Sequence, residues 1–186
     1  MTALKFPPPF IEAAHFTSAT RSAVDLVVLH SMESYEKPGT ARAVAEWFHD
    51  PRRSPRASAH YMVDDREVIQ SVREADVAWA APGSNHNGVH IEHAGRAAQT
   101  ADDWGDEYSM AMLHLSVELC ASICRAWTIP AELVDAAGLL VHRRGITTHA
   151  EVSRAFKRST HWDPGPSFPL PWYVERVAGL LAERVA

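Results

Sequence analysis

Runs of apolar residues in the first half of the chain predict the strands of a sheet. Residues Val24–His30 are β-branched and almost continuously apolar, a pattern typical of a strand buried inside an α/β sheet. Two shorter segments, Ser58–Val63 and Glu67–Val72, are separated by three charged residues and predict a hairpin. Two further strands are expected at Asp76–Ala80 and Gly88–His93.

Helical spacing of apolar residues predicts the remaining elements. The longest helix is expected at Ser109–Trp127 and a shorter one at Thr40–Asp50. Thr148 and Glu151 match a capping box, which predicts that another helix begins near His149. Further helical stretches are expected at Ala131–Ala137 and in a closing segment that ends near Arg184. Because strands and helices alternate, we expect an α/β fold with one central sheet between helices.

Composition and charge narrow the class of protein. The 186 residues correspond to one domain, and 46% hydrophobic with 22% charged residues excludes a disordered chain. A net charge of −5 argues against nucleic acid as a partner. No apolar run approaches the roughly 18–20 residues that a membrane span needs, so no membrane insertion is expected. Three prolines, Pro7–Pro9, stand where a signal peptide would need an apolar core, which predicts synthesis in a cytoplasm without a signal peptide.

Histidine is in excess, with eleven in the chain, and three positions combine into a candidate metal site. His30 ends the first predicted strand, where ligands gather in open α/β sheets, although it could also be a polar strand terminator. His149 stands in the first turn of a predicted helix. Asp163 precedes a proline that restricts its backbone, although Asp-Pro turns are also common on surfaces. Two histidines and a carboxylate with an open fourth position are the ligands of a catalytic zinc.

The predicted strand Gly88–His93 carries two ionisable residues on one face. His90 and Glu92 alternate with Ile91 and His93, so the two pairs point to opposite faces of the sheet. A buried ionisable residue is costly unless it is used or paired. The His-x-Glu pattern also opens the zinc deaminase signature, but that signature requires a later Pro-Cys-x-x-Cys. The two cysteines, Cys120 and Cys124, lie within a helical pattern with no preceding proline, so we reject that alternative and interpret them as core residues.

Five short motifs occur in a fixed order along the chain. They are Val27-Val28-Leu29-His30, Ser58-Ala59-His60-Tyr61, Ile91-Glu92-His93-Ala94-Gly95, Gly145-Ile146-Thr147-Thr148-His149 and Asp163-Pro164-Gly165-Pro166. In this order they resemble the zinc-dependent N-acetylmuramoyl-L-alanine amidases (type 2 amidases), the superfamily shared with peptidoglycan recognition proteins. The resemblance covers about residues 24 to 177. Its third motif and the His-Trp-Asp-Pro-Gly-Pro loop resemble the amidase domains of endolysins from phages of mycobacteria and related actinobacteria.

The resemblance implies both an activity and the residues that carry it. It implies a mixed sheet flanked by helices, and hydrolysis of the amide between the lactyl group of N-acetylmuramic acid and L-alanine in peptidoglycan. It implies that His30, His149 and Asp163 hold one zinc ion per chain. Glu92 falls on the position of the catalytic glutamate, and His161 falls where members have a residue that faces the substrate carbonyl. Glu92 would take a proton from the attacking water and pass it to the leaving amine.

Some positions depart from the family pattern or stay ambiguous. Ala59 stands where some members have a catalytic tyrosine, which places the proton transfer on Glu92 instead. His142 is a rival to His149 as the second ligand, but the Gly-Ile-Thr lead-in favours His149. His60 either lines the cleft or satisfies a hydrogen bond in the core. Two tryptophans either contact substrate or pack in the core, namely Trp79 and Trp162.

The resemblance also sets the expected organisation of the chain. Residues 1–23 are predicted to form an N-terminal extension and residues 24–186 the zinc amidase catalytic domain. We expect a monomer whose partner is peptidoglycan, made in the host cytoplasm and acting on the cell wall after release. The alternatives are a non-catalytic peptidoglycan-binding module of the same fold and a zinc amidase with another substrate.

Overall fold

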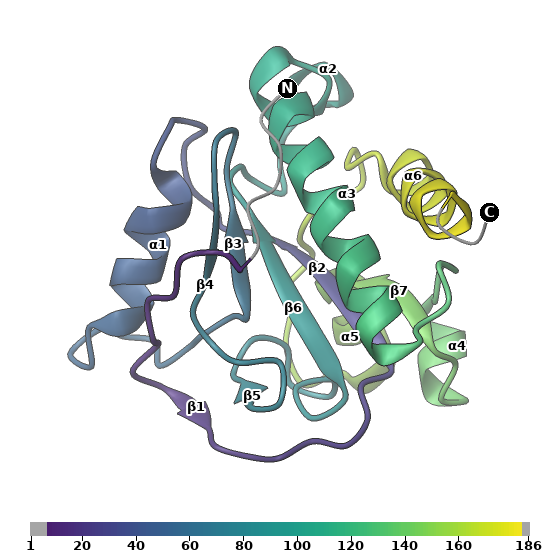
Figure 1. Ribbon diagram of the computed structural model, residues 1–186, viewed down its shortest axis with the longest axis horizontal. Coiled ribbons are helices and arrows are strands. Elements are labelled where there is room, and N and C mark those ends of the chain that lie inside the picture. The colour runs from purple at the N-terminus through teal and green to yellow at the C-terminus, as the bar shows by residue number, and fades with distance from the viewer. Residues whose placement is uncertain (1–6, 184–186) are drawn as a thin grey trace.

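Five strands form the central sheet of the computed structural model, which describes residues 7–183 (Figure 1). Their order is β4-β3-β6-β2-β7. Four strands run parallel, and β4 at one edge pairs antiparallel with β3. The strands are β2 (Leu26–Ser31), β3 (Tyr61–Val63), β4 (Val68–Gln70), β6 (Gly88–His93) and β7 (Gly145–Thr148). A small antiparallel pair lies outside this sheet and consists of β1 (Phe16–Thr17) and β5 (Val77–Ala78).

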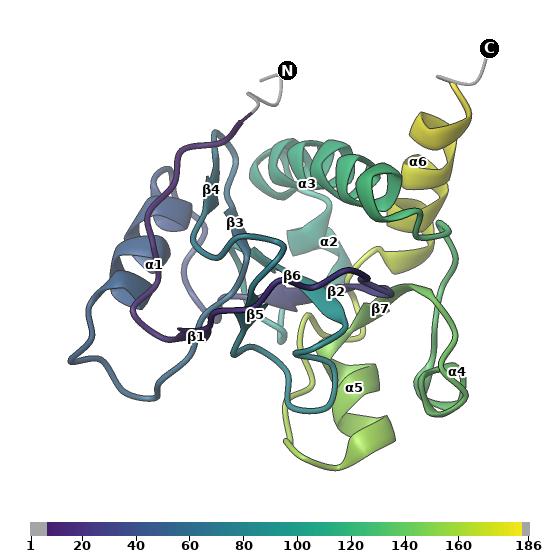
Figure 2. The same ribbon diagram turned by 60° about the horizontal axis from the view of Figure 1, so that its bottom comes forward.

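One face of the sheet is closed by two long helices. Val27 and Leu29 of β2 and Ile91 of β6 belong to a hydrophobic core beneath these helices, since alternate strand residues point to the same face. The covering helices pack against each other and lie on the same side of the sheet in Figure 2. They are α3 (Glu107–Trp127) and α6 (Leu170–Ala182).

The opposite face is covered by two shorter helices that leave a gap between them. Met62 of β3 packs with residues of α1 (Thr40–His49), which lies over β3 and β4. Leu26 and Val28 of β2 pack with Val152 of α5 (His149–Phe156), which lies over β2 and β7. The carboxyl ends of β2 and β6 therefore lie between α1 and α5, at the edge where ligands gather in open α/β sheets.

The predicted fold class is confirmed, and the bounds of several elements follow the prediction. The strand at Gly88–His93 has the bounds expected from its alternating pattern, and the long helix begins at Glu107 because Asp106 caps it. Cys120 and Cys124 are buried inside that helix, as expected of core residues. The predicted strands of the hairpin are present but shorter, as β3 and β4.

The segment around residue 131 was predicted wrongly. Instead of a helix at Ala131–Ala137, the chain stays extended and Leu133 forms a parallel bridge with Ile146 of β7. The backbone at Val134 donates to Ile146 O, and Ile146 N donates to Glu132 O. Hydrogen bonds to a strand that is distant in sequence thus override the local helical pattern. The remaining helices are α4 (Ala136–Leu140) and α2 (Ala101–Trp104).

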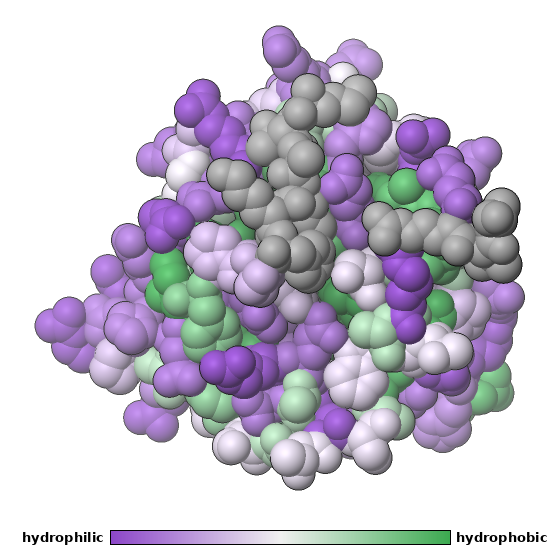
Figure 3. Space-filling model, in the orientation of Figure 1, coloured by the Kyte–Doolittle hydropathy of each residue, from purple (hydrophilic) through white to green (hydrophobic). Residues whose placement is uncertain are grey.

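The N-terminal segment packs along the edge of the sheet. Ile11 N donates to Gln70 O of β4, and Gln70 N donates to Pro9 O. The predicted end of the last helix at Arg184 and the first residues of the predicted extension, 1–6, lie outside the described residues. Within residues 7–183, no helix combines the length and the hydrophobicity that crossing a membrane requires. On the face seen in Figure 3, hydrophobic residues reach the surface in small groups among hydrophilic ones.

Candidate metal centre and cleft

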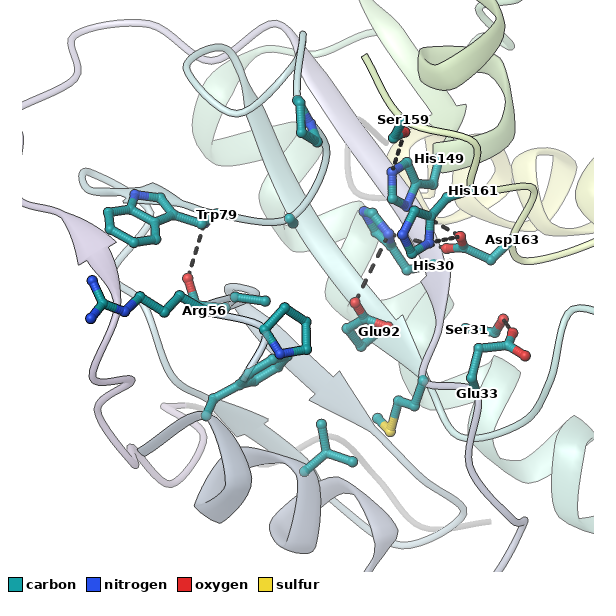
Figure 4. A pocket seen from close by; sticks show the side chains of 18 of the residues that line it. His30, Ser31, Glu33, Arg56, Trp79, Glu92, His149, Ser159, His161 and Asp163 are labelled. Carbon is teal, nitrogen blue, oxygen red and sulfur yellow. Dashed lines mark hydrogen bonds and ion pairs between the residues drawn. The ribbon is translucent and has the colours of Figure 1, made fainter. Parts of the chain in front are cut away.

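Three of the predicted site residues converge at the open edge of the sheet. Asp163 Oδ2 lies 3.2 Å from His30 Nδ1, and Asp163 Oδ1 lies 3.1 Å from His149 Nδ1. One ligand atom from each residue lies within 4.8 Å of the other two, and all three side chains are buried. Figure 4 shows the three side chains pointing toward one another at one end of a cleft.

The register of the parallel strands places both histidines at the same level. Leu29 of β2 pairs with Thr148 of β7. His30 follows Leu29 and His149 follows Thr148, so the two histidines lie side by side. Thr148 ends the strand and caps α5, because its hydroxyl accepts a hydrogen bond from Glu151 N at 3.3 Å. In a capping box the Glu151 carboxylate would accept from the backbone of Thr148. It accepts instead from Ala136 N at 2.8 Å.

Asp163 is held beside His149 by its own loop. The first turn of α5 donates a hydrogen bond from Ala150 N to Asp163 O at 3.0 Å. Two residues later, Gly165 has a φ of 93° and lies against the backbone of Ala97. A Cβ at position 165 would stand 1.9 Å from Ala97 O, so only glycine allows the loop to dock there.

The electrostatics of the cluster favour the forms that bind metals. Burial by itself would raise the pKa of Asp163, but hydrogen bonds from His149 and His30 outweigh it and hold this pKa well below its usual range. Burial also lowers the pKa of His30, with a smaller contribution from His149, although the hydrogen bond to Asp163 opposes this. A carboxylate and a neutral imidazole are the protonation states that a metal requires of these side chains.

The second nitrogen of each histidine is also held. His30 Nε2 lies 3.0 Å from His90 Nδ1, and His149 Nε2 lies 3.3 Å from Ser159 Oγ. Both histidines therefore direct Nδ1 toward Asp163, as metal ligands do when a partner orients their other nitrogen. Two imidazoles and one carboxylate that converge in this way form a cluster able to hold a metal ion. The sequence carries no local signal for the role of Ser159.

Glu92 and His161 stand next to this cluster. Glu92 Oε1 lies 3.9 Å from His30 Nδ1, because the two residues are paired across β2 and β6. Burial raises the pKa of Glu92 well above its usual range, and the nearby Asp163 and Glu33 add to the effect. His161 stacks on His149 with ring centroids 4.6 Å apart, and its Nδ1 lies 3.5 Å from Asp163 Oδ1. The structure thus brings all five predicted site residues together.

A cleft of about 730 Å³ extends from the cluster toward α1. Trp47 and Phe48 of α1 form an apolar wall, and Trp79 and Arg56 lie across the cleft from the histidines (Figure 4). Trp79 is held in place because its Nε1 donates to the hydroxyl of Thr17 at 2.9 Å. This apolar wall was not predicted, because helical spacing predicts the helix but not which of its residues face a cleft.

The structure resolves the remaining ambiguous residues. His60 is buried and satisfies a core hydrogen bond, since its Nδ1 accepts from His90 N at 3.0 Å. Trp79 lines the cleft, whereas Trp162 is exposed and does not contribute to its wall. His142 is exposed and lies outside the cluster of potential ligands.

Comparisons with known proteins agree with this architecture. The family model for N-acetylmuramoyl-L-alanine amidase matches residues 20–166. The N-acetylmuramoyl-L-alanine amidase A of Achromobacter lyticus is 32% identical over 172 residues, which cover 87% of this chain and 88% of the relative. The ligand complex of the Staphylococcus aureus hydrolase AmiA has a TM-score of 0.74 at 15% identity, covering 100% of this chain and 89% of AmiA. A selenomethionine derivative of AmpD has a TM-score of 0.63 at 18% identity, and the match covers 95% of this chain and 99% of AmpD. At these identities the two structures show a shared fold.

Proposed function

We propose a zinc-dependent mechanism for this chain. The chain belongs to the N-acetylmuramoyl-L-alanine amidase family. It hydrolyses the amide between the lactyl group of N-acetylmuramic acid and L-alanine in peptidoglycan. The observation that carries the proposal is the buried cluster of His30, His149 and Asp163, which faces a cleft. We infer that these three residues hold one zinc ion. A zinc bound there would polarise the scissile carbonyl and acidify the attacking water.

Glu92 is suited to move the protons of this reaction. Its Oε1 faces His30, and its Oε2 has no hydrogen-bond partner among residues 7–183. Its raised pKa allows the side chain to accept a proton from water and then donate it to the leaving amine. A general base must lie within hydrogen-bond reach of the water, and the position of Glu92 beside His30 in the lining of the cleft supports this role.

His161 is suited to stabilise the charge that develops on the carbonyl oxygen. It reaches the cleft from the loop that also supplies Asp163, and most of its side chain is exposed to the cleft or solvent. A donor that is already in place when negative charge develops lowers the barrier, because it needs no reorganisation during the reaction. Stacking on His149 orients the ring of His161 for this role.

Metal content and amide cleavage test this assignment together. We expect the wild-type chain to bind one zinc ion and to release peptides with a new amino-terminal alanine from purified cell walls. His149→Ala should lose most of the zinc and the activity, because only His30 and Asp163 would remain. The matched control is His142→Ala, which removes an exposed histidine of the same region and should keep both.

Two outcomes would contradict the proposal. Loss of zinc from His142→Ala with full zinc in His149→Ala would mean that the wrong histidine has been assigned. Binding of the wall without release of peptide by a zinc-loaded wild type would favour the non-catalytic module. The phage origin, the cytoplasmic synthesis, the monomeric state and the boundary at residue 23 stay predictions.

A further inference from the structure

We propose that His90 is a positioning residue, which holds the ligand histidine His30 by accepting a hydrogen bond from its Nε2–H while Nδ1 of His30 faces the metal. This inference rests on the proposed zinc site. It concerns a residue that does not itself belong to the cluster of potential ligands. The contact that carries it is the 3.0 Å distance between His30 Nε2 and His90 Nδ1, inside a fully buried pair of side chains.

The protons of this pair follow from the ligand geometry. A neutral imidazole carries one proton, and a metal takes the nitrogen that lacks it. If Nδ1 of His30 holds the zinc, its proton is on Nε2, and His90 Nδ1 must be the acceptor at 3.0 Å. An acceptor at this position fixes the ring of His30 and makes its Nδ1 a stronger donor to the metal.

His90 is itself held by His60, which directly precedes β3. Its backbone N–H donates to His60 Nδ1 at 3.0 Å, and the rings of His60 and His90 are stacked with an interplanar angle of 12°. The Nε2 of His60 faces both Asp76 O at 3.3 Å and the guanidinium of Arg21, whose Nη2 lies 3.1 Å away. The side chain of His90 also depends on Gly88, because a Cβ there would lie 3.2 Å from His90 Nε2. Stacking on His60 and complete burial restrict rotation of the His90 ring.

Folding alone does not explain a histidine at this position. In the zinc-bound arrangement the proton of His90 is on Nε2, and this atom is buried without a hydrogen-bond partner among residues 7–183. A buried polar group that lacks a partner costs free energy, which an apolar side chain of similar size would avoid. A histidine at this position therefore points to a role of its other nitrogen, Nδ1, which meets His30.

A matched pair of variants separates the hydrogen bond from packing. His90→Asn and His90→Leu remove the same ring and have similar size, but only asparagine offers an acceptor oxygen at the position of Nδ1. Zinc affinity is measured by competition with a chelator, and unfolding of the metal-free proteins shows that both variants fold. Loss of an outer partner of a metal ligand typically weakens metal binding about 10- to 100-fold, which we expect for His90→Leu, with His90→Asn close to wild type. An equal loss in both variants, or no loss in either, would overturn the proposal.

Nuclear magnetic resonance of the ¹⁵N-labelled, zinc-loaded wild type gives a test that needs no variant. We expect the proton of His30 on Nε2 and protected from exchange, and the proton of His90 on Nε2 with Nδ1 unprotonated. A proton on His90 Nδ1 would overturn the inference even if both variants failed to fold. The two proposals fail differently: a wild type that binds no zinc overturns both, whereas tight zinc binding by His90→Leu overturns only the role of His90.

Discussion

Both faces of strand β6 bury histidine side chains, but the two faces differ in how many of the buried polar atoms have hydrogen-bond partners. On the face beneath α3, His93 has both ring nitrogens in hydrogen bonds, to His30 O at 2.8 Å and to Ser116 Oγ at 2.6 Å. On the opposite face, His90 Nε2 and Glu92 Oε2 are buried without a hydrogen-bond partner among residues 7–183. The polar side chain on the face beneath α3 (the partnered face) thus has all its hydrogen bonds, whereas those on the opposite face (the unpartnered face) do not within the described part of the chain. A fully partnered polar side chain is explained by folding, whereas a buried atom without a partner needs a further explanation.

The partnered face of β6 also stabilises the position of His30 through hydrogen bonds from α3 and α6. The hydroxyl of Tyr173 in α6 donates to Ser116 O at 2.9 Å and lies 2.7 Å from Ser116 Oγ. Ser116 contacts His93, which donates to the main-chain oxygen of His30. The strand that carries His30, a proposed metal ligand, is therefore held through its backbone on one face, while His90 and Asp163 contact the His30 side chain on the other.

Glu92→Gln should have the largest effect on rate, since it removes the proposed base from the unpartnered face. The rate of peptide release should fall about 10²- to 10⁴-fold. Burial, together with Asp163 and Glu33, raises the pKa of Glu92 and favours its neutral form in the metal-free protein, which glutamine resembles. Zinc content and the free energy of unfolding should therefore stay near wild type. A zinc-loaded variant that releases peptide at the wild-type rate would remove Glu92 from the mechanism.

His161→Ala should have the next largest effect. Loss of one hydrogen-bond donor to a developing oxyanion costs about 10²- to 10³-fold in kcat. Zinc should be retained, because His161 lies outside the cluster of potential ligands. The control is Trp162→Ala, which alters the adjacent exposed residue away from the cleft wall and should leave kcat unchanged. A wild-type kcat in His161→Ala, measured by steady-state release of peptide, would contradict the assigned role.

Tyr173→Phe should have the smallest effect and should act on stability alone. The variant loses a buried hydroxyl that bonds Ser116, which should lower the free energy of unfolding by about 0.5–1.5 kcal/mol. The control is Tyr108→Phe, which removes a more exposed hydroxyl bonded to Lys37 O and should cost less. Denaturant titration gives both values, and kcat of the folded variants should match wild type. A reduced kcat with unchanged stability would mean that the partnered face takes part in the reaction.

The sequence by itself determined the elements whose pattern is local. The alternation of Gly88–His93 depends only on neighbouring residues, so the strand and the faces of His90 and Glu92 were predicted with their bounds. Thr148 likewise marks the start of α5, because a cap acts within a few residues. The order of short motifs, together with the family resemblance, predicted five candidate site residues, and the structure brings these residues together.

Only the tertiary structure decided the contacts between distant segments. The segment before α4 is extended because it bonds to β7, and local helical spacing could not show that partner. The contacts of His90 with His30 and of Ser159 with His149 depend on strand register and on the path of a loop. The cleft wall depends on where α1 crosses the sheet. Short-range patterns act through neighbouring backbone groups, whereas these contacts exist only after the chain has folded and long-range packing has selected one register.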